Sequence, residues 1–187
     1  YGVWARGYGS FFNQGETEGF GGYEATIGGA VIGADKKVND YLIGLGGGYA
    51  NTRLQGNWGS DGTSDTLYGT LYGAWKKDHS YVELSGNYAW NDVETDGSAR
   101  VGDYQGEFTA YTASLLLGGG IGFDTYEEKL IITPEASLLT TYYDREAYTE
   151  KATSTDGTWP DKMYDAYDQM SYLGSLGVSL TMKEHIE

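Results

Sequence analysis

Apolar side chains alternate with small or polar ones, with a period of two residues, along eight segments of the chain. Residues 80–90 (SYVELSGNYAW) show the pattern, because Val82, Leu84 and Trp90 fall on one side of the alternation and Glu83 falls on the other. Successive side chains of a β-strand point to opposite faces, so each segment predicts a strand with one apolar and one polar face. No stretch between the segments has a helical period, and the pattern therefore predicts an all-β protein.

Most of the eight predicted strands are long enough to cross a lipid bilayer at a tilt, which takes about 9–11 residues. The strands are expected at Val3–Phe12, Tyr23–Ala34, Tyr41–Leu54, Asp65–Lys76, Ser80–Asn91, Ala110–Phe123, Leu130–Arg145 and Met170–Met182. The connections alternate between short (35–40, 77–79 and 124–129) and long (13–22, 55–64, 92–109 and 146–169). This alternation predicts a transmembrane antiparallel up-and-down β-barrel with short periplasmic turns and long extracellular loops. Both ends of the chain are then expected on the periplasmic side.

The polar positions within the strands predict which face points outward. They are rich in Gly, Ser, Thr and Glu, a composition unsuited to the packed interior of a soluble barrel. A soluble ligand-binding barrel is therefore disfavoured. The charged residues Arg6, Glu24, Glu83 and Glu135 are expected to face the lumen, either in a hydrated conduit or as pairs that stiffen a plugged barrel. The apolar residues expected to face lipid include Ile43, Leu45, Leu84, Leu115, Leu176 and Val178.

The composition agrees with a barrel of one domain, residues 1–187. The 30 glycines and 18 tyrosines exceed ordinary usage, and glycine permits both curvature and the close packing of a neighbouring aromatic ring. Aromatic residues suit interfacial girdles, and Trp4, Trp75 and Trp90 are predicted to be interfacial anchors. The mean hydropathy of -0.47 does not exclude a membrane protein, because the lumen faces and the loops of a barrel are polar. The longest uncharged stretch, 108–123, is too short for a spanning helix of about 20 residues.

The charged and nucleophilic residues predict no catalytic, cofactor-binding or metal site. A net charge of -15 argues against nucleic acid as a partner, and the chain contains no cysteine. Neither of the two histidines, His79 and His185, has a second ligand at metal-binding spacing, and no Ser-His-acid triad can be assembled around them. The acidic residues concentrate in the long connections, where they are either solvated or in contact with divalent cations at the cell surface.

Several short motifs resemble, in order, the autotransporter beta-domain, which is the translocator of type V secretion. They are Val3–Gly7 (VWARG), Gly28–Asp35 (GGAVIGAD), Leu67–Trp75 (LYGTLYGAW), Tyr81–Trp90, Ile132–Ala136 (ITPEA) and Ala147–Glu150 (AYTE). The resemblance implies a non-enzymatic barrel in the bacterial outer membrane that anchors and exports an N-terminal passenger. It also implies outer-membrane lipid, the barrel-assembly machinery and a passenger in cis as partners.

The family barrel has twelve strands, so the resemblance implies that about eight of a probable twelve are present and that the C-terminal strands are missing from residues 1–187. The alternative is a self-contained eight-stranded outer-membrane barrel with a structural or adhesive role. Its interior would be filled by side chains, and no passenger could cross it. The many small residues on the predicted inner face argue against this alternative, because they would leave so narrow an interior underfilled.

Overall fold

The computed structural model describes residues 2–16, 21–57, 59–99, 102–125, 130–153 and 159–182, which form strands, turns and no helix. The strands are β1 (Gly2–Gln14), β2 (Tyr23–Val38), β3 (Tyr41–Gly56), β4 (Ser60–Lys77), β5 (Ser80–Ala99), β6 (Gly102–Ile121), β7 (Phe123–Thr125), β8 (Leu130–Arg145), β9 (Tyr148–Ala152), β10 (Lys162–Tyr164) and β11 (Tyr167–Met182). In the described part of the chain, no helix is long and apolar enough to cross a membrane.

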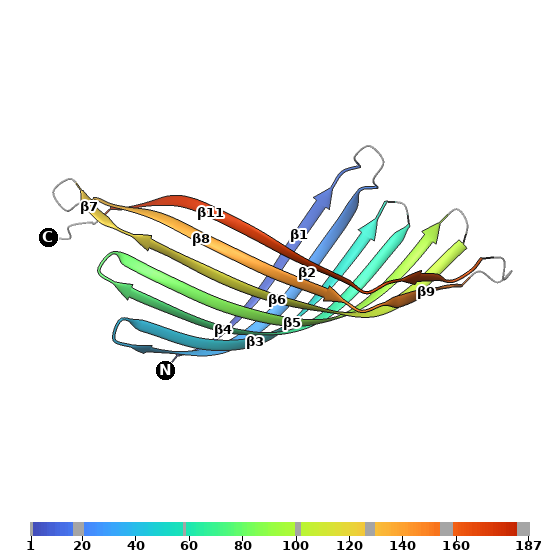
Figure 1. Ribbon diagram of the computed structural model, residues 1–187, viewed down its shortest axis with the longest axis horizontal. Coiled ribbons are helices and arrows are strands. Elements are labelled where there is room, and N and C mark those ends of the chain that lie inside the picture. The colour runs from blue at the N-terminus through green and yellow to red at the C-terminus, as the bar shows by residue number, and fades with distance from the viewer. Residues whose placement is uncertain are drawn as a thin grey trace.

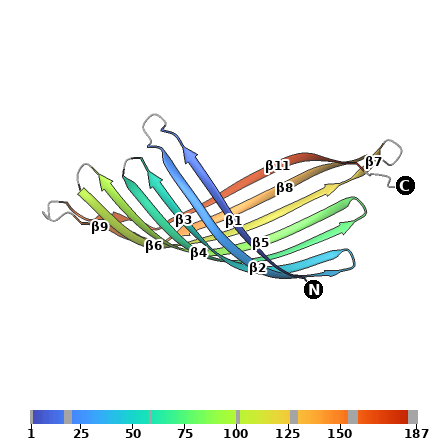
Figure 2. The ribbon, with the colours of Figure 1, turned by 180° about the vertical axis from the view of Figure 1, so that it is seen from behind.

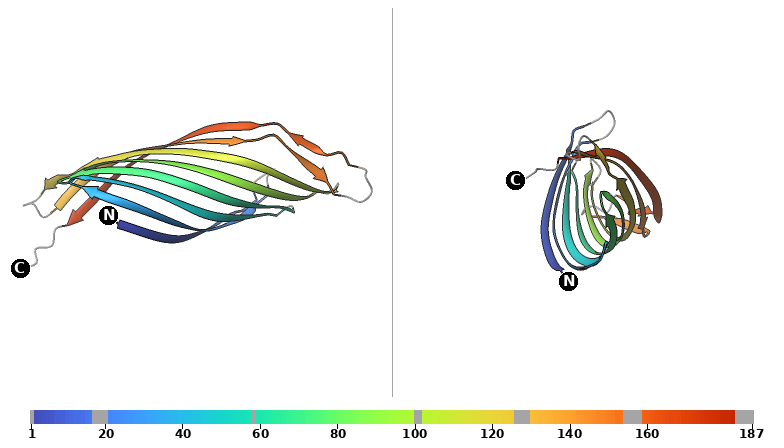
Figure 3. Two further views of the ribbon diagram at one scale, coloured as in Figure 1. Left: turned by 90° about the horizontal axis from the view of Figure 1, so that it is seen from below. Right: turned by 90° about the vertical axis from the view of Figure 1, so that its left-hand side faces the viewer.

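All strands join one antiparallel sheet whose main path runs β1-β2-β3-β4-β5-β6-β8-β11. The sheet is strongly twisted and curves into a trough, which is seen from its two broad sides in Figures 1 and 2 and along its length in Figure 3. β1 and β11 form its two edges, and the described residues of these strands do not pair with each other. The expected up-and-down topology is confirmed, in a sheet that is not closed.

The predicted count of eight strands is wrong, because the structure contains eleven. The predicted strand 110–123 is interrupted at Gly122, and β9 and β10 lie within the range 146–169 that was expected to be a loop. β7 keeps the register of β6 along β8, and the two are separated at Gly122, whose backbone N–H donates to the His79 carbonyl at 3.0 Å. β9 continues β8 along β6 after a shift of one residue near Glu146 and Ala147. β10 and β11 pair with β9 and β8 in a single register, so they follow one line.

Two further predicted long loops, besides 146–169, are also largely strand. β5 and β6 run on as a hairpin through most of the range 92–109, and β3 and β4 do the same through most of 55–64. The outer-face side chains there are polar, and on the inner face Val93, Tyr104 and Phe108 are interspersed with polar residues, so the period-two hydrophobic signal weakens. The backbone pairing nevertheless continues, because it does not depend on which side chains the strands carry. At the other edge, β2–β3 and β4–β5 turn within two residues, with Asn39 (φ 55°) and Asp78 (φ 53°) in the left-handed region.

The assignment of faces is confirmed with two corrections. All the residues expected to face lipid are exposed on the outer, convex face, and Leu176 on the edge strand β11 reaches 90%. Glu24 does not face the lumen, because it lies on the same side of β2 as the exposed Ile32. Trp4 is not an interfacial anchor, because its indole lies on the inner face against Tyr72.

The inner face is packed by aromatic rings laid over glycines of neighbouring strands. The ring of Tyr72 on β4 covers Gly44 on β3, and that of Tyr68 covers Gly48, where an added Cβ would lie 2.6 Å from the ring. Trp4 covers Gly33 in the same way. A side chain at any of these glycines would displace the ring above it. The high content of glycine and tyrosine is therefore explained by close packing across strands.

Candidate functional site

The inner face of the trough is the candidate functional surface. Of the four charges expected there, Arg6, Glu83 and Glu135 are found on it. Glu135 accepts a hydrogen bond from Ser179 of β11 at 2.8 Å. Of the two alternatives for these charges, pairing of Arg6 with Glu83 or Glu135 is not seen among the described residues, and these side chains line an open trough.

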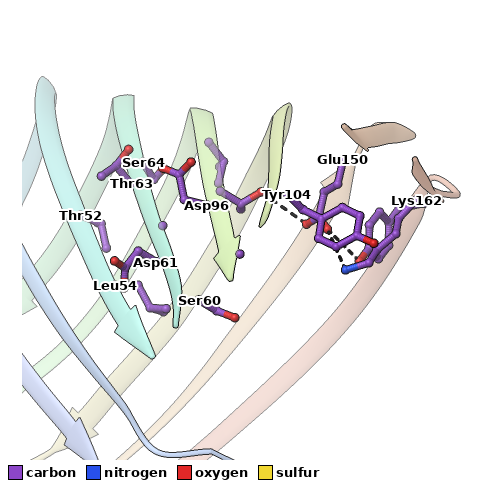
Figure 4. A pocket seen from close by; sticks show the side chains of 15 residues that line it. Thr52, Leu54, Ser60, Asp61, Thr63, Ser64, Asp96, Tyr104, Glu150 and Lys162 are labelled. Atoms are coloured by element: carbon purple, nitrogen blue, oxygen red, sulfur yellow. Dashed lines mark hydrogen bonds and ion pairs between the residues drawn. The ribbon is translucent and has the colours of Figure 1, made fainter. Parts of the chain in front are cut away.

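The same face carries a cavity of about 1010 Å³ at the end with the long hairpins. Its lining comes from β3, β4, β5 and β6 on one side and from the β9–β10 hairpin on the other (Figure 4). Thr52, Ser60 and Ser64 contribute hydroxyl groups to the first side, beside Leu54 and Val93. An ion pair between Lys162 and Glu150 (3.8 Å) lies on the second side. The Lys162 ammonium lies 3.5 Å from the ring centroid of the buried Tyr104, and Thr95 and Tyr164 donate hydrogen bonds to Glu150 at 3.5 and 3.2 Å.

An aromatic cluster beside this cavity holds the β9–β10 hairpin against β6. Tyr148 stacks on Tyr164, with the ring centroids 4.8 Å apart and the ring planes 9° from parallel. The centroid of the Tyr148 ring also lies 4.5 Å from that of Phe108 on β6. The Arg145 guanidinium lies 5.0 Å from the Tyr148 ring and donates to the Asp165 carbonyl at 2.8 Å. Burial raises the pKa of both Tyr148 and Tyr164, so these phenols remain neutral well into the alkaline range.

The sequence missed this cluster, because the range 146–169 was expected to be a loop. The sequence offered only a short alternation here, in which Tyr148 and Glu150 alternate with Thr149 and Lys151. Five residues are too few for periodicity to separate a strand from a loop. The partners of the cluster, on β6, could not be identified from spacing at all.

The histidines do not form a site in the described part of the chain. His79 lies 3.2 Å from Asp124 of β7, and His185 lies outside the described residues. No group of three or more metal-ligating side chains is found among the residues described.

The sequence matches the family described as "Autotransporter beta-domain" over residues 3–183. The chain belongs to the autotransporter beta-domain family. The resemblance inferred from the short motifs is thus confirmed over almost the whole chain.

Two curated relatives give the same picture. The "Extracellular serine protease" of Serratia marcescens is 27% identical over 155 residues, which are 80% of this chain and 15% of that protein. "Outer membrane protein B" of Rickettsia typhi is 27% identical over 167 residues, which are 82% of this chain and 10% of that protein. The chain therefore spans only a small part of the relatives that it matches, and their names describe much longer proteins.

Solved structures confirm the fold. The beta domain of the Bordetella autotransporter BrkA has a TM-score of 0.72 at 19% identity, with 97% of this chain and 70% of that chain covered. The translocator domain of the autotransporter NalP from Neisseria meningitidis has a TM-score of 0.69 at 15% identity, with 95% and 59% covered. Both solved structures are domains of autotransporters, and their similarity to this chain supports the antiparallel transmembrane-type sheet expected for the family.

Proposed function

We propose that residues 1–187 form part of a closed barrel that lets a passenger on the same polypeptide reach the cell surface. The observation that carries this proposal is the open trough itself. It has an inner face of polar side chains and of aromatic rings laid over glycines, an apolar outer face, and two edges, β1 and β11, whose described residues leave their outer sides unpaired. Unpaired strand edges are costly in lipid, where no water can satisfy the backbone. Further strands of the same protein would cover both edges and enlarge the lumen.

The proposed role is transport without catalysis. The inner face would act through shape and hydration, because its hydroxyl and charged groups can solvate an extended or helical chain without holding it at one place. We further propose that the cell's barrel-assembly machinery inserts the domain, because an edge strand such as β11 must be shielded from lipid until its final partner is in place. The identity of the passenger is outside this proposal.

Disulfide trapping in the full-length protein tests the barrel arrangement. Gly7 of β1 and Leu176 of β11 both lie on the outer face. If further strands separate these edges, the pair Gly7→Cys and Leu176→Cys should not crosslink in the membrane. Gly7→Cys with Ala30→Cys is the matched positive control, because these residues are direct neighbours across β1 and β2. Efficient crosslinking of the first pair would favour the narrow eight-stranded barrel and refute the proposal.

Surface display tests the transport role separately. An epitope placed upstream of residue 1 in the full-length protein should become accessible to antibody on intact cells. Depletion of the barrel-assembly machinery should reduce the amount of folded domain and displayed epitope together. A folded, membrane-inserted domain whose upstream epitope stays inside the cell would contradict the export role and leave the barrel arrangement standing.

A further inference from the structure

The outer face carries an apolar groove of about 510 Å³ that spans β3 to β6. Gly73 and Gly86 form its floor, and large apolar side chains of the neighbouring strands form its walls. The register explains the shape: Gly73 lies between Ile43 and Leu84, and Gly86 lies between Leu71 and Leu115. Each glycine thus leaves a gap, flanked on both sides by a large side chain, in the otherwise continuous apolar surface.

Aromatic and basic side chains lie at the end of this groove that faces the short turns. Tyr41 and Trp75 are direct cross-strand partners that line the groove there. The next residue of β4 on the outer face is Lys77, which is exposed, and the exposed Lys36 of β2 lies opposite Ile43. The groove therefore changes from apolar to aromatic to basic along the direction of the strands.

The opposite border of the outer face is predominantly acidic, with Arg53 of β3 among its carboxylates. There the aromatic residues Tyr49 and Trp90 donate hydrogen bonds to the carboxylates Asp65 and Asp92. An anionic group would be repelled by this border and attracted by the one that carries Lys77. The two aromatic borders of the sheet are thus chemically different, and only one of them suits a phosphate.

We propose that the groove binds one phospholipid with an anionic headgroup, from the leaflet on the short-turn side. Its acyl chain would lie over Gly73 and Gly86, where burial against the apolar walls is favourable. The glycerol region would lie beside Tyr41 and Trp75, since such rings prefer the headgroup level of a membrane. The phosphate would be held by the ammonium of Lys77. This proposal rests on the lipid contact of the outer face and does not depend on passenger export.

Fluorescence quenching by brominated lipids tests the proposal in the full-length protein reconstituted into phosphatidylcholine vesicles. The probe is a variant of this domain that keeps Trp75 and replaces the other tryptophans by phenylalanine. Brominated phosphatidylglycerol should occupy the site beside Trp75 about fivefold more readily than brominated phosphatidylcholine, the preference expected for one lysine near an anionic headgroup. A matched variant that keeps only Trp90 should show no preference for the anionic lipid.

Three substitutions distinguish the contact of Lys77 with the lipid headgroup from the binding of the acyl chain in the groove. Lys77→Gln should abolish the preference at Trp75, and Lys77→Arg should retain it. Gly86→Leu should fill the groove and reduce quenching by both lipids, and it is compatible with the fold because no atom lies within 4 Å of a Cβ at this position. Lys151→Gln, at the far end of the sheet, is the charge control and should change nothing.

Equal quenching of Trp75 by the two lipids would overturn the proposal, as would an anionic preference that survives Lys77→Gln. Quenching unaffected by Gly86→Leu would show that the lipid does not use the groove, and would also overturn it. A concentration-dependent loss of quenching that accompanies dimer formation would assign the groove to a second copy of the chain instead. Gel electrophoresis verifies that each variant is folded, because a folded barrel migrates differently in unheated and in boiled samples.

Discussion

The indole N–H of Trp4 donates a hydrogen bond of 2.9 Å to the phenolic oxygen of Tyr72, although 68 residues separate them in the chain. Tyr72 in turn donates to Asp35 of β2 at 3.1 Å. The network therefore joins the edge strand β1 to β4 across the two strands between them. The glycines beneath the rings, Gly33 and Gly44, allow both side chains to lie flat on the inner face.

This network predicts how much the free energy of unfolding falls when the Tyr72 hydroxyl is removed, or when the space above Gly44 is filled. Tyr72→Phe should lower the free energy of unfolding by about 1–2 kcal/mol, because the ring remains and the two hydrogen bonds of its hydroxyl are lost. Gly44→Ala should cost about 1–3 kcal/mol, because the new methyl group would displace the Tyr72 ring. Urea unfolding of the full-length protein in vesicles measures both. Gly28→Ala is the control, since nothing lies within 4 Å of its Cβ, and an equal loss there would contradict the packing argument.

The orientation of the sheet in lipid predicts unequal effects of two adjacent substitutions. Leu84→Arg should destabilise the domain by about 2–4 kcal/mol, because it places a charge on the lipid side near the middle of the membrane. Ser85→Arg, on the inner face, should cost much less. Spin labels at the two positions provide a second measurement, with Leu84 in contact with lipid and Ser85 with water. Water contact at Leu84 would reverse the assignment of faces.

The alternation of hairpin lengths predicts the sidedness of the domain. Protease added to intact cells should cut within 146–169, if it cuts the domain at all, because this long connection is expected outside the cell. The short connection expected at 35–40, in which Asn39 and Asp40 form the turn between β2 and β3, should be cut only after the outer membrane is permeabilised. Cleavage at 35–40 in intact cells would show that the topology is inverted.

The aromatic cluster predicts that the β9–β10 hairpin loosens at alkaline pH. Burial raises the folded-state pKa of Tyr148 and Tyr164 above the usual value of about 10, so folding favours the neutral phenols. Their contribution to stability is full below pH 10 and declines as the pH rises above it, because the unfolded hairpin loses its protons first. Hydrogen exchange of β9 and β10 measures the opening.

The variant Tyr148→Phe with Tyr164→Phe is the control for this pH dependence. It retains the stacked rings and removes both titrating groups, so exchange in β9 and β10 should become less sensitive to pH between about 9 and 12 after correction for the intrinsic exchange rate. An unchanged pH dependence in this variant would assign the effect to another group.

The alternation of side chains was sufficient to locate the eight strands on the main path of the sheet and to assign most of their faces. Leu84 and Glu83 fall on opposite faces because a strand leaves no other choice once its period is two. The order of the strands followed as well, since short connections force sequential neighbours to pair. The family could be inferred because local motifs such as Ile132–Ala136 survive in sequence, and the match over residues 3–183 confirms it.

The tertiary structure decided what depends on contacts between distant strands. Glu24 lies outward because it shares the face of Ile32 on the uninterrupted strand β2, and the structure shows that this strand already begins at Tyr23. Trp4 turns inward because Gly33 beneath it and Tyr72 beside it make a place for its ring. The β9–β10 hairpin forms because Tyr148 and Arg145 find Phe108 on β6. Periodicity reports only which side chains share a face, whereas packing partners are chosen by shape and distance in three dimensions.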